Sequence, residues 1–428
     1  MKLSKFFIPA KKEIPSDVKL NSHILMLRSG MIHLEVSGIY SWLPFGFRVL
    51  KKIQNIIEEE HIRNDINQML MPTIQPSEIW IKSNRFDSYG LEMLKITDRN
   101  KKKLLYGPTN EEMVTVIGND YINSYKQLPV NLFHIQTKFR DEIRPRHGVM
   151  RAREFIMKDA YSFDKNKNDS YDTYKMYFKM YIQIFKKLGI DIIPVKALSG
   201  EIGGEISHEF HMICESGESR IIYTDLPNEK SVFDYFDFYK KNYSSTDEYF
   251  NKDEKKPKTY HVANSIELGH IFLFGEKYSK PFNFKIDTPE GSVNPYMGSY
   301  GIGISRLPAA IIEKNYDKKG IIWPKEISPF DLMLINLKIE NEGCLSFCEG
   351  LYKELKKYNI EVLYDDTNER VGIKFNKSDL FGIPYQIIVG NKYTENKMVQ
   401  IKNRKTHLEV ECSAGQILKK ILSIIKDD

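Results

Sequence analysis

The chain has few cysteines and no long apolar run, and each absence excludes a class of protein. Four cysteines occur in 428 residues, too few for a disulfide-stabilised scaffold. Cys344 and Cys348 lie close together on an expected helix, but no second cysteine or histidine pair accompanies them. No zinc site is therefore expected, and buried thiols are the better interpretation. No apolar run approaches the ~18 residues that a membrane-spanning helix needs, so no membrane partner is expected.

The amino terminus also lacks the features of a secretory signal. Its one apolar run, Phe6-Phe-Ile8, is too short for a signal-peptide core, and we expect a cytoplasmic protein. The chain also has no large excess of either charge. It contains 63 basic and 57 acidic residues, and the formal net charge is +6. Such a balance permits nucleic-acid binding without establishing it. The length fits about two to four domains at roughly 100 to 200 residues each.

One stretch that is present, Phe139 to Phe163, carries a marked excess of arginine. Two extended runs are separated by Pro145 and Gly148, which predicts a hairpin with a long basic loop. Arginine forks fit phosphate oxygens, and an aromatic face such as that of Phe155 can stack on a base. A nucleotide site is one interpretation, and a solvated, salt-bridged hairpin is the other. The six cations of the stretch are Arg140, Arg144, Arg146, Arg151, Arg153 and Lys158.

Two further stretches favour the nucleotide site. They read Gly107-Pro-Thr-Asn-Glu-Glu112 and Met297-Gly-Ser-Tyr-Gly-Ile-Gly-Ile-Ser-Arg306. With Phe139-Arg-Asp-Glu142 between them, and Gly38 to Leu50 and Pro72 upstream, they resemble the three signature motifs of class II aminoacyl-tRNA synthetases. The individual residues of these motifs resemble those of the bacterial-type prolyl-tRNA synthetases, in a short form without the inserted editing domain. The resemblance covers nearly the whole chain.

The resemblance implies an α/β fold class with two domains. The catalytic domain, residues 1–328, would be an α+β core around the antiparallel sheet of class II synthetases, and residues 329–428 would form a smaller α/β anticodon-binding domain. Periodicity in the second part agrees, because expected strands alternate with expected helices. The strands are expected at 331–337, 360–365, 383–389 and 399–402, and the helices at 343–357, 372–382 and 414–426.

Apolar spacing predicts two longer helices in the first part. The helix from Arg48 to Arg63 is amphipathic and leads into an apolar strand, Met69 to Ile74. In the family this helix and strand form motif 1, which implies a homodimer. The helix from Asp169 to Leu188 carries an aromatic stripe at core spacing. Its members are Tyr174, Phe178, Tyr181, Phe185 and Leu188.

The resemblance also assigns the proline site. Thr109, Glu111, Arg140 and His270 would bind L-proline, with Glu111 facing its ammonium group. The residues themselves allow another interpretation, in which Thr109 caps a helix from Glu111 to Asp120 and the glutamates are favourable first-turn charges.

ATP, the second substrate, would be bound mainly by the hairpin and by motif 3. Arg140 would hold the α-phosphate beside the proline carboxylate, Glu142 would bind the adenine amino group, and Phe155 would stack on the ring with Arg306 beneath it. Arg151 would bind the β- and γ-phosphates, and Arg306 would reach the γ-phosphate. Arg140 and Arg306 are the expected catalytic residues, and Glu267 is an expected ligand of the Mg²⁺ that accompanies ATP.

For tRNA(Pro), Arg144 is the expected contact to the acceptor end, and Asp365, Arg370 and Lys374 are candidate anticodon contacts. Residues 199–210, rich in glycine, are expected to form an active-site loop that leads into a strand. Residues 225–260 are polar, lack a clear apolar period and stand where longer relatives carry an editing domain, so editing in cis is not expected. Two alternatives remain open: a non-catalytic, synthetase-like RNA-binding or regulatory subunit, and a class II enzyme for another amino acid such as threonine or serine.

Overall fold

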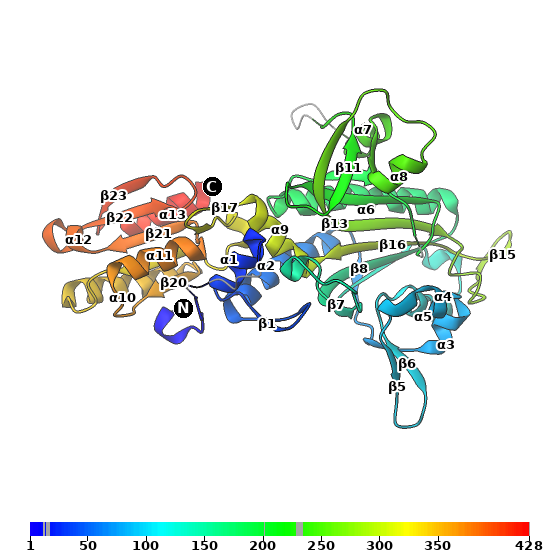
Figure 1. The fold of residues 1–428 in the computed structure, drawn as a ribbon, viewed down its shortest axis with the longest axis horizontal. Coiled ribbons are helices and arrows are strands. Elements are labelled where there is room, and N and C mark those ends of the chain that lie inside the picture. The colour runs from blue at the N-terminus through cyan, green and yellow to red at the C-terminus, as the bar shows by residue number, and fades with distance from the viewer. Residues whose placement is uncertain (12, 14–17, 201, 228–233, 428) are drawn as a thin grey trace. The chain divides into compact units, whose positions relative to one another are not determined.

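The computed structural model describes residues 1–11, 13, 18–200, 202–227 and 234–427 (Figure 1). Contacts divide the chain into two compact units. One comprises Met1–Glu35, Tyr40–Ile53 and Ile311–Asp428, and the other comprises Val36–Ile39 and Gln54–Ala310. The first 35 residues therefore group with the carboxy-terminal segment, and the domain boundary between residues 328 and 329 stays a prediction.

A large sheet organises the unit that contains Gln54–Ala310. Among its described residues, nine strands pair in the order β10-β9-β12-β11-β13-β16-β8-β7-β3, and β10 also pairs with β13. Most neighbours are antiparallel, as in the predicted α+β core, while β3–β7 and β9–β12 are parallel. The strands are β3 (Asn67–Gln68), β7 (Val130–Phe139), β8 (Glu154–Asp164), β9 (Ile193–Lys196), β10 (Ile206–Ile213), β11 (Ser219–Tyr223), β12 (Ser244–Thr246), β13 (His261–Gly275) and β16 (Tyr296–Gly303).

The register of this sheet brings distant motifs to one place. The end of β7 lies opposite the start of β8, at Phe139 and Glu154. Further along β8, Met157 pairs with Gly303 of β16, and β16 in turn pairs with β13 around His270. Segments more than a hundred residues apart in the sequence thus end side by side, and their polar side chains meet there.

Helix α6 (Lys167–Lys187) packs on strands β8, β13 and β16. It begins after Asn166, whose side chain accepts hydrogen bonds from the amides of Asn168 and Asp169 and so caps the helix. All five members of the predicted aromatic stripe are buried. The predicted core helix is therefore confirmed, and its neighbour Tyr177 stacks on Tyr300 of β16 with ring centroids 3.6 Å apart.

The predicted helix of motif 1 is also confirmed, and α2 (Pro44–Arg63) begins four residues earlier than expected, with proline at its start. The strand predicted over Met69–Ile74 is wrong. Two short strands, β3 and β4 (Ile74–Pro76), flank an extended stretch in which Leu70 is 76% exposed. An isolated apolar run does not distinguish a buried strand from an exposed one.

The segment 225–260 is more structured than its polar composition predicts. It contains α7 (Tyr235–Lys241), β12 and α8 (Asp247–Lys252), and β12 joins the large sheet between β9 and β11. Side chains of Asp234 and Thr246 cap the two helices. Residues 228–233 of this segment, and Glu201 of the glycine-rich loop, lie outside the described residues. That loop does lead into a strand, β10, as predicted.

The other unit contains a second sheet in the order β20-β19-β21-β22-β23. Its alternation with helices confirms the predicted α/β pattern, although α12 and β23 were not predicted. Cys344 and Cys348 are buried in its core, and all four cysteines of the chain are free thiols. The elements are β19 (Leu332–Asn336), α10 (Glu342–Lys357), β20 (Val362–Asp365), α11 (Val371–Phe381), β21 (Tyr385–Val389), α12 (Asn391–Asn396), β22 (Met398–Asn403), β23 (Glu409–Ser413) and α13 (Ile417–Asp427).

Two of the candidate anticodon residues are not on the surface of this unit. Asp365 is 0% exposed and Lys374 is 2% exposed, and their side chains form an ion pair at 3.1 Å. An anticodon contact needs an accessible side chain, so this burial argues against that role for the pair, which lies at the end of β20 and in the first turn of α11. Arg370 is exposed at the start of α11 and stays a predicted contact.

None of the helices among the described residues is long and apolar enough to cross a membrane.

The remaining elements are short or connect the others. They are α1 (Asn21–Arg28), β1 (Ile32–Val36), β2 (Ile39–Trp42), α3 (Ser77–Lys82), α4 (Arg85–Ser88), β5 (Lys95–Thr97), β6 (Lys103–Tyr106), α5 (Glu111–Tyr121), β14 (Ile286–Thr288), β15 (Gly291–Val293), α9 (Leu307–Lys314), β17 (Tyr316–Asp317) and β18 (Gly320–Ile321).

Candidate active site

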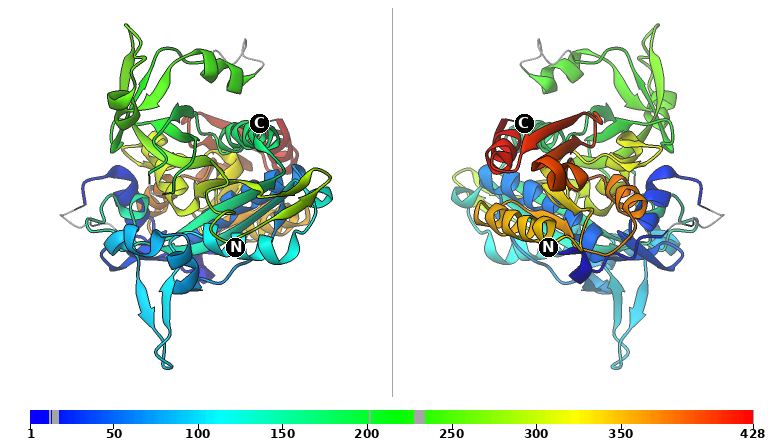
Figure 2. Two further views of the ribbon diagram at one scale, coloured as in Figure 1. Left: turned by 90° about the vertical axis from the view of Figure 1, so that its right-hand side faces the viewer. Right: turned by 90° about the vertical axis from the view of Figure 1, so that its left-hand side faces the viewer.

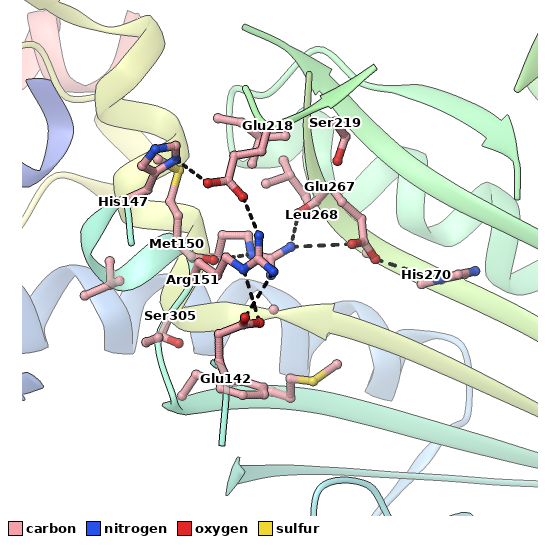
Figure 3. A pocket seen from close by; sticks show the side chains of 18 of the residues that line it. Glu142, His147, Met150, Arg151, Glu218, Ser219, Glu267, Leu268, His270 and Ser305 are labelled. Carbon is pink, nitrogen blue, oxygen red and sulfur yellow. Dashed lines mark hydrogen bonds and ion pairs between the residues drawn. The ribbon is translucent and has the colours of Figure 1, made fainter. Parts of the chain in front are cut away.

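A cavity of about 340 Å³ opens where the end of β7, the start of β8, the middle of β13 and the end of β16 meet (Figure 3). Side chains from the basic hairpin, from the turn before β11 and from motif 3 line it together. Seven residues predicted from the sequence are among them: Arg140, Glu142, Arg151, Phe155, Glu267, His270 and Arg306.

The basic hairpin is confirmed, but its loop is longer than predicted. Strand β7 ends at Phe139 and β8 begins at Glu154, so the arginines expected on strands lie in the loop between them. The loop is anchored at its base, where the Arg140 amide donates to the Arg153 carbonyl (2.9 Å) and the Arg153 amide donates to the Gly38 carbonyl (2.7 Å). A Cβ atom at Gly38 would lie 2.7 Å from the Cβ of Pro145, so glycine is required there.

Arg140 is the cation of this site with no opposing carboxylate. Its Nε and Nη2 donate to the Pro108 carbonyl at 3.3 and 3.2 Å, and its guanidinium lies 5.3 Å from the centre of the Phe155 ring. Within the described ranges, no carboxylate is within ion-pair distance of it. A guanidinium held by a carbonyl and an aromatic face keeps its charge available for an anion.

Arg151 has two acidic partners. Its guanidinium binds Glu142 at 3.1 Å and Glu218 at 3.0 Å. Burial alone would raise the pKa of Glu142, but the hydrogen bonds from Arg151 and from the Arg144 amide, together with the charges of Arg151 and Arg146, outweigh it and lower that pKa. Figure 3 shows Arg151 between these two carboxylates. Arg151 therefore lines the cavity with its positive charge balanced by these two carboxylates.

Glu218 was not predicted from the sequence. Its carboxylate also accepts from Arg146 at 2.7 Å and His147 at 2.8 Å, besides Arg151. One side chain from the turn before β11 therefore ties down the tip of the basic loop. Nothing in the sequence near Ser216-Gly-Glu218 indicates a partner so far away in the chain.

Replacing Glu218 by glutamine is expected to loosen the tip of the loop. Partly exposed ion pairs are worth about 0.2 to 1 kcal/mol each, so loss of the shared carboxylate is expected to cost about 1 kcal/mol locally. Amide hydrogen exchange at Met150 and Arg151 should then be about fivefold faster. Glu215→Gln, in the same turn but exposed, is the control. Unchanged protection in Glu218→Gln would contradict the anchoring role.

A second cluster of polar side chains surrounds His270. Its Nδ1 lies 3.6 Å from Glu267 and 3.7 Å from Glu209, and its Nε2 is 2.5 Å from the Ser207 hydroxyl. Arg306 donates from Nε to the Met150 carbonyl (2.9 Å) and from Nη1 to the Glu267 carbonyl (2.5 Å). Burial would raise the pKa of Glu267, but His270 and Arg306 outweigh it and lower the pKa to about 2.

Glu267, Glu209 and His270 offer one ligand atom each within 4.8 Å of one another. Glu209 was not predicted, because it follows the glycine-rich loop on a different strand. Two carboxylate oxygens are the kind of ligand that Mg²⁺ prefers, whereas the imidazole nitrogen is not. The donor set therefore fits Mg²⁺ through its two glutamates.

Thr109 and Glu111 are buried and do not line the cavity. Asn110, rather than Thr109, precedes helix α5, and no side chain caps that helix start, so the capping interpretation is wrong. Instead, the Thr109 hydroxyl donates to Glu111 at 2.6 Å, and Ser299 donates to the other carboxylate oxygen at 3.1 Å. The pair adjoins Arg140 through the Pro108 carbonyl.

Arg85 is a further partner that the sequence did not indicate. It is 2% exposed, and its Nη1 lies 3.3 Å from Glu111 and 3.0 Å from Glu112. Gln75 holds the same segment by donating to the Thr109 carbonyl at 2.9 Å. A Cβ atom at Gly107 would lie 2.1 Å from that amide nitrogen, which explains the glycine of the motif.

Arg144 lies on the exposed part of the loop and does not line the cavity. Its amide donates to Glu142 at 3.3 Å. The structure leaves its role as a contact to the tRNA acceptor end a prediction.

Comparison with known proteins agrees with this geometry. Residues 89–315 match the family model described as tRNA synthetase class II core domain (G, H, P, S and T), and residues 331–424 match the model described as anticodon binding domain. The chain is 49% identical over 432 residues to a proline–tRNA ligase of Rickettsia canadensis, with 100% of this chain and 98% of that protein covered. It is 52% identical over 411 residues to a proline–tRNA ligase of Rickettsia bellii, with 95% of each covered.

Solved structures share the fold. A prolyl-tRNA synthetase from Cryptosporidium parvum, complexed with halofuginone and AMPPNP, superposes with a TM-score of 0.77 at 16% identity, covering 95% of this chain and 77% of that one. The same enzyme with L-proline and AMP gives a TM-score of 0.76 at 17% identity, covering 98% and 77%.

Proposed function

The chain belongs to the proline–tRNA ligases of the class II aminoacyl-tRNA synthetases, and we propose how its residues activate L-proline with ATP and transfer the prolyl group to tRNA(Pro). The observation that carries the proposal is the meeting of Arg140, Arg151 and Arg306, from separate parts of the sequence, at one cavity. A non-catalytic relative would have no need of all three, so the catalytic function is favoured.

In the first step, a carboxylate oxygen of proline attacks the α-phosphorus of ATP. The bond between that phosphorus and the bridging oxygen breaks, and pyrophosphate leaves. In the second step, a ribose hydroxyl at the 3′ end of tRNA attacks the carbonyl carbon of prolyl-adenylate, and AMP leaves. Both substitutions depend on alignment and charge neutralisation rather than on a covalent catalyst.

Arg140 is the proposed catalytic cation. Because it has no carboxylate partner among the described residues, it is free to hold the α-phosphate as charge develops there, and to approach the proline carboxylate. Arg151, beside Glu142 and Glu218, binds the β- and γ-phosphates by exchanging acidic partners for phosphate oxygens. Arg306, in the helical turn that follows β16, binds the γ-phosphate.

Glu142 and Phe155 are proposed to hold the adenine. Both line the cavity beside the arginines. Glu142 accepts from the adenine amino group, and the half-buried Phe155 ring stacks on the base with Arg306 on the other side.

The proline ammonium is assigned to Glu111, supported by Thr109. The Glu111 carboxylate is fixed by three donors, Thr109, Ser299 and Arg85, and a fixed buried carboxylate favours a cation. His270 completes the amino-acid side of the site, since it lines the cavity.

Mg²⁺ with ATP is assigned to Glu267 and Glu209. When bound, the ion neutralises charge on the triphosphate. Glu267 lines the cavity itself. Glu209 does not, but it lies 3.7 Å from His270, which does.

The proposal includes a homodimer in the cytoplasm. Exposed apolar side chains around motif 1 support the interface, because Ile62, Leu70 and Ile74 are 58%, 76% and 40% exposed. For tRNA(Pro), the second family match, residues 331–424, supports an anticodon-binding role for that part of the chain, with Arg370 as a contact there and Arg144 at the acceptor end.

The experiment is aminoacylation of a tRNA(Pro) transcript with radiolabelled proline. Acid-stable transfer of proline, dependent on ATP and Mg²⁺, is expected. Charging of a threonine or serine tRNA with its own amino acid, and not of tRNA(Pro), would reject the assignment in favour of another class II specificity.

Alanine is expected to be mischarged. Alanine lacks only two of the ring carbons of proline, and each missing methylene group is worth only about 1 to 3 kcal/mol of discrimination, as known from synthetases. Residues 225–260 take the place of an editing domain. Ala-tRNA(Pro) should accumulate when alanine replaces proline in the assay. Clearance of purified Ala-tRNA(Pro) by this protein would contradict the prediction.

A further inference from the structure

The β5–β6 hairpin projects from the unit that holds the cavity (Figures 1 and 2). Strand β5 pairs with β6 so that Thr97 lies opposite Lys103, and residues 98–102 form the turn. This basic tip, residues 98–103, has no role in the steps above.

The tip presents positive charge that is not neutralised locally. Arg99, Lys101, Lys102 and Lys103 are exposed. Across the described part of the chain, none of them has a carboxylate within ion-pair distance, whereas Lys95 at the base does reach Asp87. The one acidic residue, Asp98, is used within the turn, where its carboxylate accepts from the amides of Asn100 and Lys102, both at 2.8 Å.

The turn also has an ordered backbone. The Lys101 amide donates to the Asp98 carbonyl at 3.0 Å, and the Asp98 amide donates to the Lys102 carbonyl at 3.1 Å. Lys101 itself has φ = 62°, a left-handed conformation that costs a side chain about 1 to 2 kcal/mol and that glycine would adopt freely. The basic side chains of the tip are therefore carried on a hydrogen-bonded turn.

The hairpin begins next to the cavity. Glu92, just before it, lines the cavity, and its carbonyl accepts from the Asp141 amide of the basic loop at 2.8 Å. At the far end of β6, Tyr106 packs edge-on against Phe139. With a rise of about 3.3 Å per residue, the tip lies roughly 20 Å from this base, on the same unit as the cavity.

We propose that the basic tip binds the phosphate backbone of the tRNA whose 3′ end enters the cavity. This rests on the proposed function, since it needs RNA at the site. Lysine and arginine contacts to phosphates give affinity without reading sequence. A solvated turn with no partner is the alternative, and it predicts no effect of removing the charges.

The test is a triple variant, Arg99→Gln, Lys101→Gln and Lys102→Gln. The kcat/KM for tRNA(Pro) should fall about tenfold near physiological salt, and the slope of log kcat/KM against log salt should become shallower by about 2 to 3. Proline-dependent ATP–pyrophosphate exchange without tRNA should stay within twofold. A matched variant that keeps the charge, Lys101→Arg with Lys102→Arg, should charge tRNA normally.

Equal kcat/KM and salt slope in the glutamine variant and the unmodified chain would overturn the inference. So would a change in sedimentation without a change in tRNA kinetics, which would assign the tip to a second copy of the chain. Failure of the unmodified chain to charge tRNA(Pro) would instead reject the proposed function, so the two failures are distinguishable.

Discussion

Replacing Arg140 by alanine is expected to lower proline-dependent ATP–pyrophosphate exchange by about 10²- to 10³-fold, the cost of removing one preorganised charge from a reacting centre. The loss should appear mainly in kcat, because the charge on the α-phosphate develops in the transition state. The measurement is initial-rate exchange at saturating ATP and proline.

Folding should be nearly unaffected by this change. The guanidinium of Arg140 donates to a single carbonyl, that of Pro108, at 3.2 and 3.3 Å, so about 0.5 to 1.5 kcal/mol of stability is at stake. Arg144→Ala, on the exposed part of the same loop, is the control and should leave exchange without tRNA unchanged. Exchange within a few-fold of normal in Arg140→Ala would remove Arg140 from the catalytic role.

Replacing Arg85 by methionine is expected to destabilise the protein by about 3 to 5 kcal/mol, because it leaves buried carboxylates without their cation. Burial alone would lower the pKa of Arg85, but Glu112, Tyr278 and Glu111 outweigh it and raise that pKa. Burial raises the pKa of Glu112 despite the attraction of Arg85. Removing Arg85 therefore leaves two buried carboxylates without the cation that lies 3.3 Å from Glu111 and 3.0 Å from Glu112.

Urea unfolding measures this loss as a lower midpoint at unchanged slope. Lys82→Met, an exposed cation on neighbouring helix α3, is the control and should change stability by less than about 0.5 kcal/mol. Adding Glu112→Gln to Arg85→Met should recover part of the stability, since it removes one orphaned charge. A destabilisation below about 1 kcal/mol in Arg85→Met would show that the buried pairs carry little energy.

The sequence was sufficient for features that are local or periodic. The aromatic stripe of α6 repeats at helical spacing, and Pro145 and Gly148 mark the turn of the basic hairpin. The order of the motifs, through the family resemblance, predicts that Arg140, Arg151 and Arg306 share one site, and all three line the same cavity. Each of these signals lies within a short window or in a recognisable phrase.

Ion pairs between residues that are far apart in the sequence could not be predicted from it. Glu218 neutralises Arg151 across 67 residues, and Arg85 neutralises Glu111 across 26, with no pattern to connect them. Asp365 and Lys374, two of the candidate anticodon contacts, form an ion pair inside the unit, which no pattern in the sequence indicated either. Strand β12 was missed because its serines carry no apolar alternation, and its neighbours in the sheet hold it.

The central claim is that this cavity activates proline. Amino-acid-dependent ATP–pyrophosphate exchange, measured on the purified protein with each of the twenty amino acids and without tRNA, tests it most directly. Strong exchange with proline and a weaker signal with alanine is the predicted result. Exchange driven by another amino acid, or silence with all twenty in a folded protein, would contradict it.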